Sequence, residues 1–213
     1  MAALLQHLCA QGFTGAPRFL GRDEEGRASL SYLTGDVPAR FRRFADEQVH
    51  AAGALLRAFH EATRDCTLAA GSPVVCHGDP GPHNTVFRDG GPVAFIDFDL
   101  AGPGHPMQDL GYMAWTWCIS SKPERGPVSF QAHQIRILAE AYGIPRQQRA
   151  AIIDAILERL DWNIGFWCQS DDEFVASGNI VPTPERVAEI IDWTRREKSF
   201  VEQHRIEIVG ALA

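Results

Sequence analysis

Hydrophobic residues recur at helical spacing along much of the chain. Apolar side chains at Val49, Ala52, Leu56 and Phe59 return every three or four positions, which predicts a helix with one buried face over residues 45–66. Comparable patterns predict further helices over residues 1–12, 108–120, 129–143, 146–168 and 184–208, and short apolar runs predict strands over 16–21 and 28–35. The pattern indicates a small strand-containing piece followed by a larger helical piece.

A β-hairpin is predicted inside the helical piece. The β-rich runs at residues 84–88 and 93–99 flank Asp89-Gly90, a pair that favours a tight two-residue turn. Asn84 begins the outgoing strand and Asp97 lies near the end of the returning strand. Because the turn folds one strand back on the other, we expect these two side chains to lie close together.

Composition narrows the class of protein. The chain has 213 residues, is 45% hydrophobic and carries a formal net charge of −7, which argues for a globular fold and against nucleic-acid binding. The five cysteines are odd in number and form no CxxC pair, as is typical of reduced thiols. No basic leader is recognised, and no apolar run is long enough to span a membrane, so we expect a cytoplasmic protein.

The stretch "CHGDPGPHN", residues 76–84, is the strongest chemical signal. Its prolines and glycines predict a loop, and His77, Asp79 and Asn84 within it fit the pattern H-x-D-x-x-x-x-N. An aspartate in such a loop can orient and deprotonate a hydroxyl. The oxygens of Asn84 and Asp97 suit Mg²⁺, so the parts of a phosphoryl-transfer site are present.

Residues 75–117 resemble the core of the aminoglycoside phosphotransferase and choline kinase family, which is distantly related to protein kinases. The resemblance is carried by His77-Gly78-Asp79, Asn84, Ile96-Asp97-Phe98 and Asp109-Leu110. It implies an α/β (α+β) protein-kinase-like fold, ATP or GTP as phosphoryl donor, and Mg²⁺. It also implies Asp79 as catalytic base, Asn84 and Asp97 as metal ligands in the catalytic loop 76–84 and the segment 96–99, and supporting roles for His77, Asp99 and Asp109.

The resemblance implies two lobes of unequal size. Residues 1–35 would be a remnant of the N-terminal lobe, with one helix, two strands and a hinge, and residues 36–213 would form the helical lobe. Adenine would meet the hinge at Tyr32, Leu33 and Thr34. We find no Gly-rich loop before Gly12 and no Lys or Arg before Arg18, so we expect either a start upstream of Met1 or a short form with weak or lost catalysis. Open strand edges in the shortened lobe predict a homodimer.

The acceptor site is sought in "DWNIGFWCQSDDEF", residues 161–174. Asp161, Trp162, Asp171 and Asp172 could receive a cationic amine or amino sugar, with Trp162 supplying a cation–π face. Aromatic residues at helical spacing are more typical of helix core, and the acids of a solvated loop. Both interpretations stay open.

Two other functions compete with the kinase interpretation. One is a catalytically silent binding module that keeps the kinase fold. The other is a transition-metal hydrolase that draws its ligands from His77, His83, His105, Asp79, Asp97, Asp99 and Asp109. No HxH or HxxxH pair occurs among these residues, which argues against the hydrolase.

Overall fold

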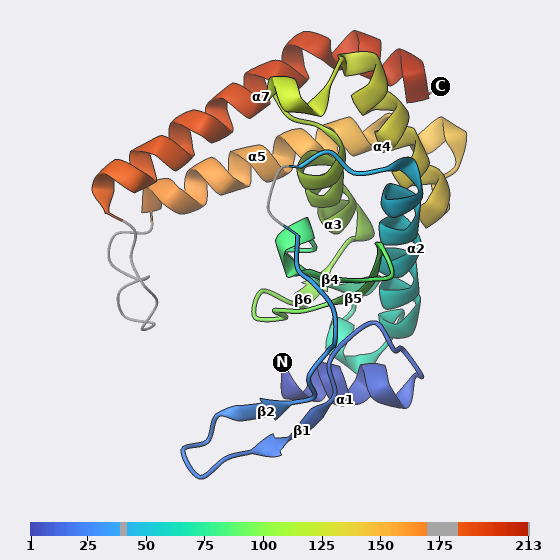
Figure 1. Cartoon of the computed structure of the whole chain (residues 1–213), viewed down its shortest axis with the longest axis vertical. Helices are drawn as coiled ribbons and strands as arrows, with labels where there is room; N and C mark the ends of the chain where they lie inside the picture. Colours follow the sequence, from blue (N-terminus) through green and yellow to red (C-terminus); the bar gives the residue numbers. More distant parts are fainter. Residues whose placement is uncertain (39–41, 170–182, 213) are drawn as a thin grey trace.

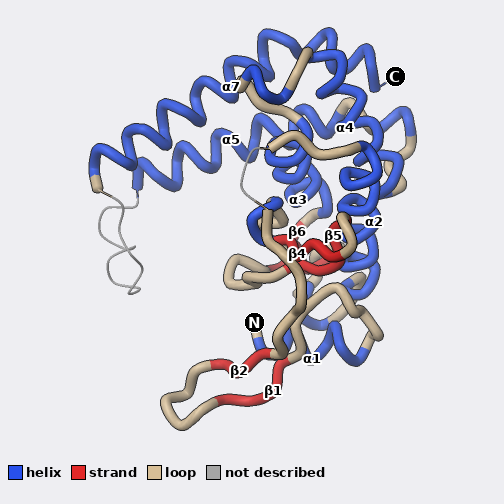
Figure 2. Tube along the Cα trace, viewed as in Figure 1, coloured by secondary structure: helices blue, strands red, loops and turns tan. Residues whose placement is uncertain are grey.

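The computed structural model describes residues 1–38, 42–169 and 183–212, arranged as shown in Figure 1. The helices are α1 (Ala2–Ala10), α2 (Asp46–Thr63), α3 (Pro106–Met113), α4 (Val128–Tyr142), α5 (Ala151–Gln169) and α7 (Pro184–Leu212). The strands are β1 (Phe19–Arg22), β2 (Ala28–Leu30), β3 (Val74–Cys76), β4 (Thr85–Arg88), β5 (Gly91–Phe95) and β6 (Gly102–Gly104). They pair as three two-stranded antiparallel sheets, β1-β2, β3-β6 and β4-β5. Figure 2 shows β4, β5 and β6 gathered in the middle of the molecule, with β1 and β2 apart from them.

The predicted α/β (α+β) fold and its long helices are confirmed. Helix α2 buries Val49, Ala52, Leu56 and Phe59, the residues whose spacing predicted it. The predicted helix over 108–120 is interrupted, because α3 ends at Met113 and the chain continues as a π-helical turn, Ala114–Cys118.

A buried arginine closes the π-helical turn. The Arg125 guanidinium donates hydrogen bonds to the carbonyl oxygens of Thr116 and Trp117, which lie at the end of the turn. These carbonyls have no partner within the turn, and a cation is favourable at the negative end of a helix. Arg125 therefore fixes the end of the segment that carries Trp115.

The predicted hairpin around Asp89-Gly90 is present as β4 and β5. Both turn residues have positive φ, 52° for Asp89 and 82° for Gly90, as a tight two-residue turn requires. Thr85 pairs with Phe95, and the Ile96 amide donates to the Asn84 carbonyl oxygen at 2.9 Å. The ladder thus runs to the strand ends, where the site residues lie.

The N-terminal hairpin β1-β2 lies beside α1 and projects away from the other helices (Figure 1). Helix α1 is joined to α2 by a 2.9 Å hydrogen bond between His7 Nε2 and the Ala62 carbonyl oxygen. On the hairpin, Leu20 is 65% exposed and Leu30 is 37% exposed. The division at residue 35 and the homodimer stay predictions.

Helices α5 and α7 lie side by side in both views (Figures 1 and 2). Glu197 of α7 is buried and accepts hydrogen bonds from the Ser120 hydroxyl at 3.2 Å and from the amide and hydroxyl of Ser121. A buried carboxylate needs such partners. Glu197 therefore fixes α7 against the segment that follows α3. Within the described residues, no helix is long and apolar enough to cross a membrane.

Candidate active site

The 76–84 loop joins β3 to β4, and Gly78 sets its course. Gly78 has φ of 84°, and a Cβ placed there would lie 2.5 Å from the Leu100 carbonyl oxygen. Both the backbone angle and the space therefore require glycine. The chain turns sharply here, between the buried His77 and the partly exposed Asp79.

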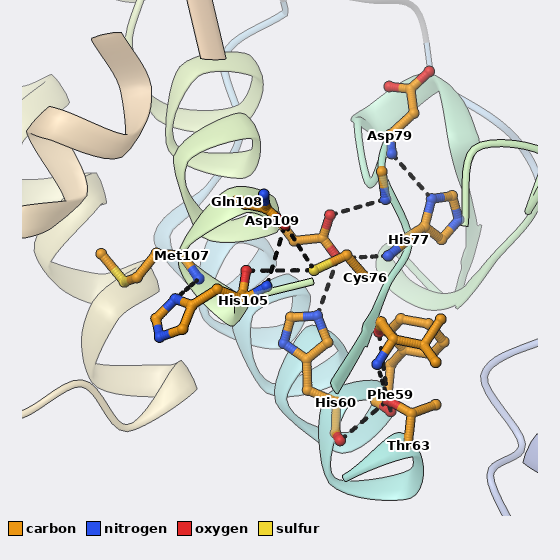
Figure 3. A network of polar contacts seen from close by, with 12 residues as sticks. Phe59, His60, Thr63, Cys76, His77, Asp79, His105, Met107, Gln108 and Asp109 are labelled. Carbon is orange, nitrogen blue, oxygen red and sulfur yellow. Dashed lines mark hydrogen bonds and ion pairs between the residues drawn. The ribbon is translucent and has the colours of Figure 1, made fainter. Parts of the chain in front are cut away.

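Asp109, in the first turn of α3, holds this loop through hydrogen bonds to the loop backbone. Its carboxylate accepts hydrogen bonds from the amides of His77 (2.6 Å) and Gly78 (2.9 Å) and from His60 Nε2 (3.0 Å). Figure 3 shows the Asp109 carboxylate between these groups, with the Asp79 carboxylate pointing away from it. Burial raises the pKa of Asp109, but the hydrogen bond and charge of His60 outweigh burial and leave the pKa lowered. Asp109 is thus a charged brace for the loop backbone.

His77 ties the loop to the strand end beside it. Its Nδ1 accepts a hydrogen bond from the Asp79 amide (3.3 Å), and its Nε2 donates to the Ile96 carbonyl oxygen (3.2 Å). Burial lowers the pKa of His77, against the opposing charge of Asp109. The ring is therefore neutral, with both nitrogens engaged within the protein.

Asp79 has one engaged and one open carboxylate oxygen. Oδ2 lies 3.3 Å from His83 Nε2, whereas Oδ1 is buried and has no hydrogen-bond partner in the described part of the chain. Burial raises the pKa of Asp79, but His83, the Tyr112 hydroxyl and the charge of Arg159 together leave it lowered. Asp79 is an ionised carboxylate that can accept one more hydrogen bond.

Asn84 and Asp97 lie at the neighbouring ends of β4 and β5. Asn84 is buried and its Nδ2 donates to the Asp79 carbonyl oxygen at 3.0 Å, so its Oδ1 is the atom left for a cation. Asp97 follows directly after Ile96, the residue paired with Asn84, and is exposed with φ of 63°. The two residues thus lie on neighbouring backbone segments, and an amide oxygen and a carboxylate are ligand types that suit Mg²⁺, which prefers oxygen ligands and few of them from protein. Asp99 is exposed in the turn that follows.

A cavity of about 620 Å³ opens beside Asp79. Its walls come from the 76–84 loop, from α3 with its π-helical turn, and from α5 and α7. Aromatic and cationic side chains predominate among the described residues that line it: Tyr112, Trp115, Trp162, Phe166, Trp167, Trp193, Lys122, Arg159, Arg186 and Arg196. Its size is that of a small-molecule site.

The predicted hinge lies beside the hairpin. The Thr34 carbonyl oxygen accepts two hydrogen bonds from the Arg88 guanidinium, at 3.0 and 3.2 Å, and Asp36 pairs with Phe87 of β4. Tyr32 is 86% exposed and Leu33 is partly exposed. The segment is thus held near β4, with the Tyr32 side chain in solvent.

Of the two predicted acceptor residues that the structure describes, one lines the cavity and the other does not. Trp162 lines the cavity, where its ring stacks on Phe166 with centroids 5.3 Å apart. Asp161 is exposed and paired with Lys198 at 2.6 Å, and it is not among the residues that line the cavity. Asp171 and Asp172 lie outside the described residues. Sequence reasoning missed Arg159, although its position one turn before Trp162 on the same helix face was a usable signal.

A buried cluster of His60, Cys76 and Asp109 has the residue types of a metal centre. Burial raises the pKa of Cys76, so the group is a thiol, and it contacts the carbonyl oxygen of His105. His60 donates to Asp109, whose oxygens also receive the loop amides. A metal needs deprotonated ligands with free lone pairs, so this cluster is a hydrogen-bonded brace.

The transition-metal hydrolase gains no support from His105. Its Nδ1 accepts a hydrogen bond from the Met107 amide at the start of α3, which is a helix-capping contact. The ring nitrogens of His77 are likewise engaged with backbone groups, those of Asp79 in the loop and of Ile96 after β5. Both histidines therefore form hydrogen bonds that stabilise the backbone.

Comparison with known proteins identifies the family of the chain. The model of the phosphotransferase enzyme family matches residues 66–152. The trifolitoxin immunity protein of Rhizobium leguminosarum bv. trifolii is 31% identical in an alignment of 235 positions that covers 99% of this chain and 87% of that protein.

Solved structures show the same fold. The GDP complex of aminoglycoside 2'-phosphotransferase-IIIa superimposes with a TM-score of 0.59 at 11% identity, covering 93% of this chain and 82% of that one. An aminoglycoside phosphotransferase from Alicyclobacillus acidocaldarius gives a TM-score of 0.56 at 15% identity, covering 99% and 80%. The chain therefore has the kinase-like fold of the aminoglycoside phosphotransferases and belongs to the phosphotransferase enzyme family.

Proposed function

We propose that the chain transfers the γ-phosphoryl group of ATP or GTP to a hydroxyl group of a small molecule. The observation that carries this proposal is the ionised Asp79 carboxylate, which lines a cavity of about 620 Å³ and keeps one buried oxygen without a partner in the described part of the chain. A buried acceptor of this kind fits a substrate hydroxyl that donates a hydrogen bond. Family membership and fold support the same reaction class.

In the proposed reaction, the acceptor hydroxyl donates to Asp79 Oδ1, which orients its oxygen toward the γ-phosphorus. A bond forms between that oxygen and the γ-phosphorus, the bond from the γ-phosphorus to the β,γ-bridging oxygen breaks, and the hydroxyl proton passes to Asp79. The other product is the nucleoside diphosphate.

Asn84 Oδ1 and the Asp97 carboxylate are the residues that would hold Mg²⁺. The ion would neutralise charge on the phosphate oxygens when bound. Asn84 also donates a hydrogen bond to the Asp79 backbone, so this one side chain links the catalytic base, Asp79, to the metal ligands. The nucleobase would contact residues 32–34, which lie near β4.

The physiological role we propose is protection against a toxic compound by phosphorylation. The relative with 31% identity is named an immunity protein for trifolitoxin. A phosphoryl group adds about −1.5 to −2 charge, which changes what a modified compound can bind. The role depends on transfer activity and is tested with it.

Calorimetry and a transfer assay test the reaction. We expect Mg²⁺-dependent binding of ATP or GTP, which Asp97→Asn makes independent of Mg²⁺. Asp79→Asn keeps the shape of the side chain and should retain nucleotide binding while transfer falls at least about a hundredfold, because general-base catalysis contributes about 10²–10⁴-fold. Asp89→Asn, at the far end of the same hairpin, is the matched control and should change neither property.

Transfer or nucleotide hydrolysis at an unchanged rate in Asp79→Asn would contradict the proposal. Binding of Mg²⁺ and nucleotide without transfer to any hydroxyl compound would instead support the catalytically silent module.

A further inference from the structure

The cavity beside Asp79 has a surplus of positive charge among its described residues. Its basic side chains are Lys122, Arg159, Arg186 and Arg196, and its acidic ones are Asp79 and Glu189. Arg186 and Glu189 pair with each other at 2.8 Å. Arg159 and Arg196 alone still outnumber Asp79, so this wall is suited to a ligand that carries negative charge of its own.

Arg159 is a cavity arginine whose charge acts on Asp79. Its Cζ lies 4.3 Å from the ring centroid of Tyr112 and 4.4 Å from that of Trp162, so two aromatic rings hold the guanidinium. Its Nε is buried and has no hydrogen-bond partner among the residues that the structure describes. The charges of Arg159 and Asp79 act on each other. A guanidinium placed in this way presents planar N–H donors next to the proposed base.

Trp115 is a second, independent donor in the same wall. Its side chain is 3% exposed and stacks on Trp193 with ring centroids 5.3 Å apart. Its indole Nε1 is buried and finds no acceptor within the described ranges. Buried tryptophans usually have a partner for this N–H, so the cavity wall lacks an acceptor that a ligand would supply.

We propose that the acceptor is a planar, largely apolar hydroxy compound that carries a carboxylate or another anionic group. This inference rests on the proposed function, because the acceptor's hydroxyl meets Asp79. Its anionic group meets Arg159 and the Trp115 N–H, and its flat body lies against the aromatic wall. A polycationic amino sugar would instead face Arg159 and Arg196, with like charges close together.

Matched probes test the charge preference directly. 4-(Hydroxymethyl)benzoate and 4-(hydroxymethyl)benzamide differ in charge but share a ring and a hydroxyl, and gentamicin is the polycationic probe. We expect the benzoate to bind at least about tenfold more tightly than the amide by calorimetry, because hydrogen bonds to charged groups are the stronger ones. Gentamicin should not compete. Tight gentamicin binding, or equal binding of benzoate and amide, would overturn the proposal.

Substitutions show which residues cause the preference for benzoate over the amide. Arg159→Met should abolish the preference for benzoate, and Arg159→Lys should retain part of it by keeping the charge without the planar N–H donors. Trp115→Phe keeps a ring but removes the N–H and should weaken benzoate binding. Arg195→Gln removes an exposed arginine of α7 that does not line the cavity, and it should change nothing. A preference that survives in Arg159→Met would contradict the assignment.

Nucleotide phosphates are the other source of negative charge, and the same variants separate the two. We expect Arg159→Met to bind Mg·ATP as the unchanged protein does. Loss of Mg·ATP binding with an intact benzoate preference would mean that Arg159 serves the nucleotide, which would overturn the inference. A benzoate preference without phosphoryl transfer would contradict the proposed function alone and leave the ligand class supported.

Discussion

His77 can satisfy both of its partners only as a neutral ring. Its Nδ1 accepts from the Asp79 amide while its Nε2 donates to the Ile96 carbonyl oxygen. Burial lowers the pKa of His77 below its ordinary value of 6.5. The unfolded chain therefore binds a proton here more readily, and stability is full above pH 6.5 and falls as the pH drops toward the lowered pKa.

The residue-scale prediction compares His77→Gln with the unchanged protein. Glutamine can still donate to Ile96 but loses the Nδ1 acceptor, so we expect a loss of about 1–2 kcal/mol at pH 7. The difference should shrink between pH 7 and pH 5, because the variant has no proton to take up at this position. Urea unfolding at both pH values measures it, with the exposed His50→Gln as control. A difference that is constant with pH would contradict the linkage.

Asp109 acts in a separate pH range. Hydrogen bonds and the charge of His60 outweigh burial and place its folded pKa below the ordinary value of 3.8. Its contribution is therefore present above pH 3.8 and is lost as the pH falls through the lowered pKa. The His77 effect can thus be measured before Asp109 titrates.

At the scale of elements, α3 and α5 make an unusually close contact at Gly111. A Cβ at Gly111 would lie 2.6 Å from the backbone of Ala155, which cannot move aside as a flexible side chain could. Tyr112 follows on α3, and Arg159 lies one turn after Ala155 on α5. The glycine therefore sets the distance across which ring and guanidinium meet.

Gly111→Ala should push these helices apart. We expect a loss of about 1–3 kcal/mol in the free energy of unfolding, as for other overpacked cores, and weaker benzoate binding. Gly210→Ala in α7 is the control, because its Cβ would meet nothing within 4 Å. It should stabilise the protein by about 0.5–1 kcal/mol through helix propensity. Equal effects of the two substitutions on unfolding would contradict close packing at Gly111.

The elements that sequence predicted are those whose signals are local. Periodicity indicated α2, and Asp89-Gly90 indicated the hairpin. Strand β6 was missed because Gly-Pro-Gly has no strand pattern, and its pairing is imposed by β3. The loop residues of the site were predicted by spacing, but the cavity was not. The spacing of Arg159 from Trp162 was a local signal, but its contact with Tyr112 depends on how α3 packs against α5, which no local pattern gives.

At the scale of the whole molecule, the charge of the cavity opposes that of the chain. The net charge is −7, while the described charged residues of the cavity contribute a surplus of two positive charges, so the rest of the chain carries −9. An anionic acceptor is therefore repelled at long range and attracted at short range. The two effects differ in how salt screens them. The Debye length shrinks from about 30 Å at 0.01 M to about 8 Å at 0.15 M salt, whereas buried pairs are screened much less.

Salt should consequently favour the anionic probe. Raising the salt concentration from low to physiological removes most of the long-range repulsion and leaves the contact with Arg159. We therefore expect the ratio of benzoate affinity to amide affinity to rise by a few-fold. In Arg159→Met the main short-range attraction is lost while the long-range repulsion remains, so the amide should bind better at low salt and the two probes equally at higher salt. Calorimetric titration at both salt concentrations measures each ratio. A ratio that falls steeply with salt in the unchanged protein would mean that exposed surface cations bind the probe, because a contact buried against Tyr112 and Trp162 is shielded from that screening.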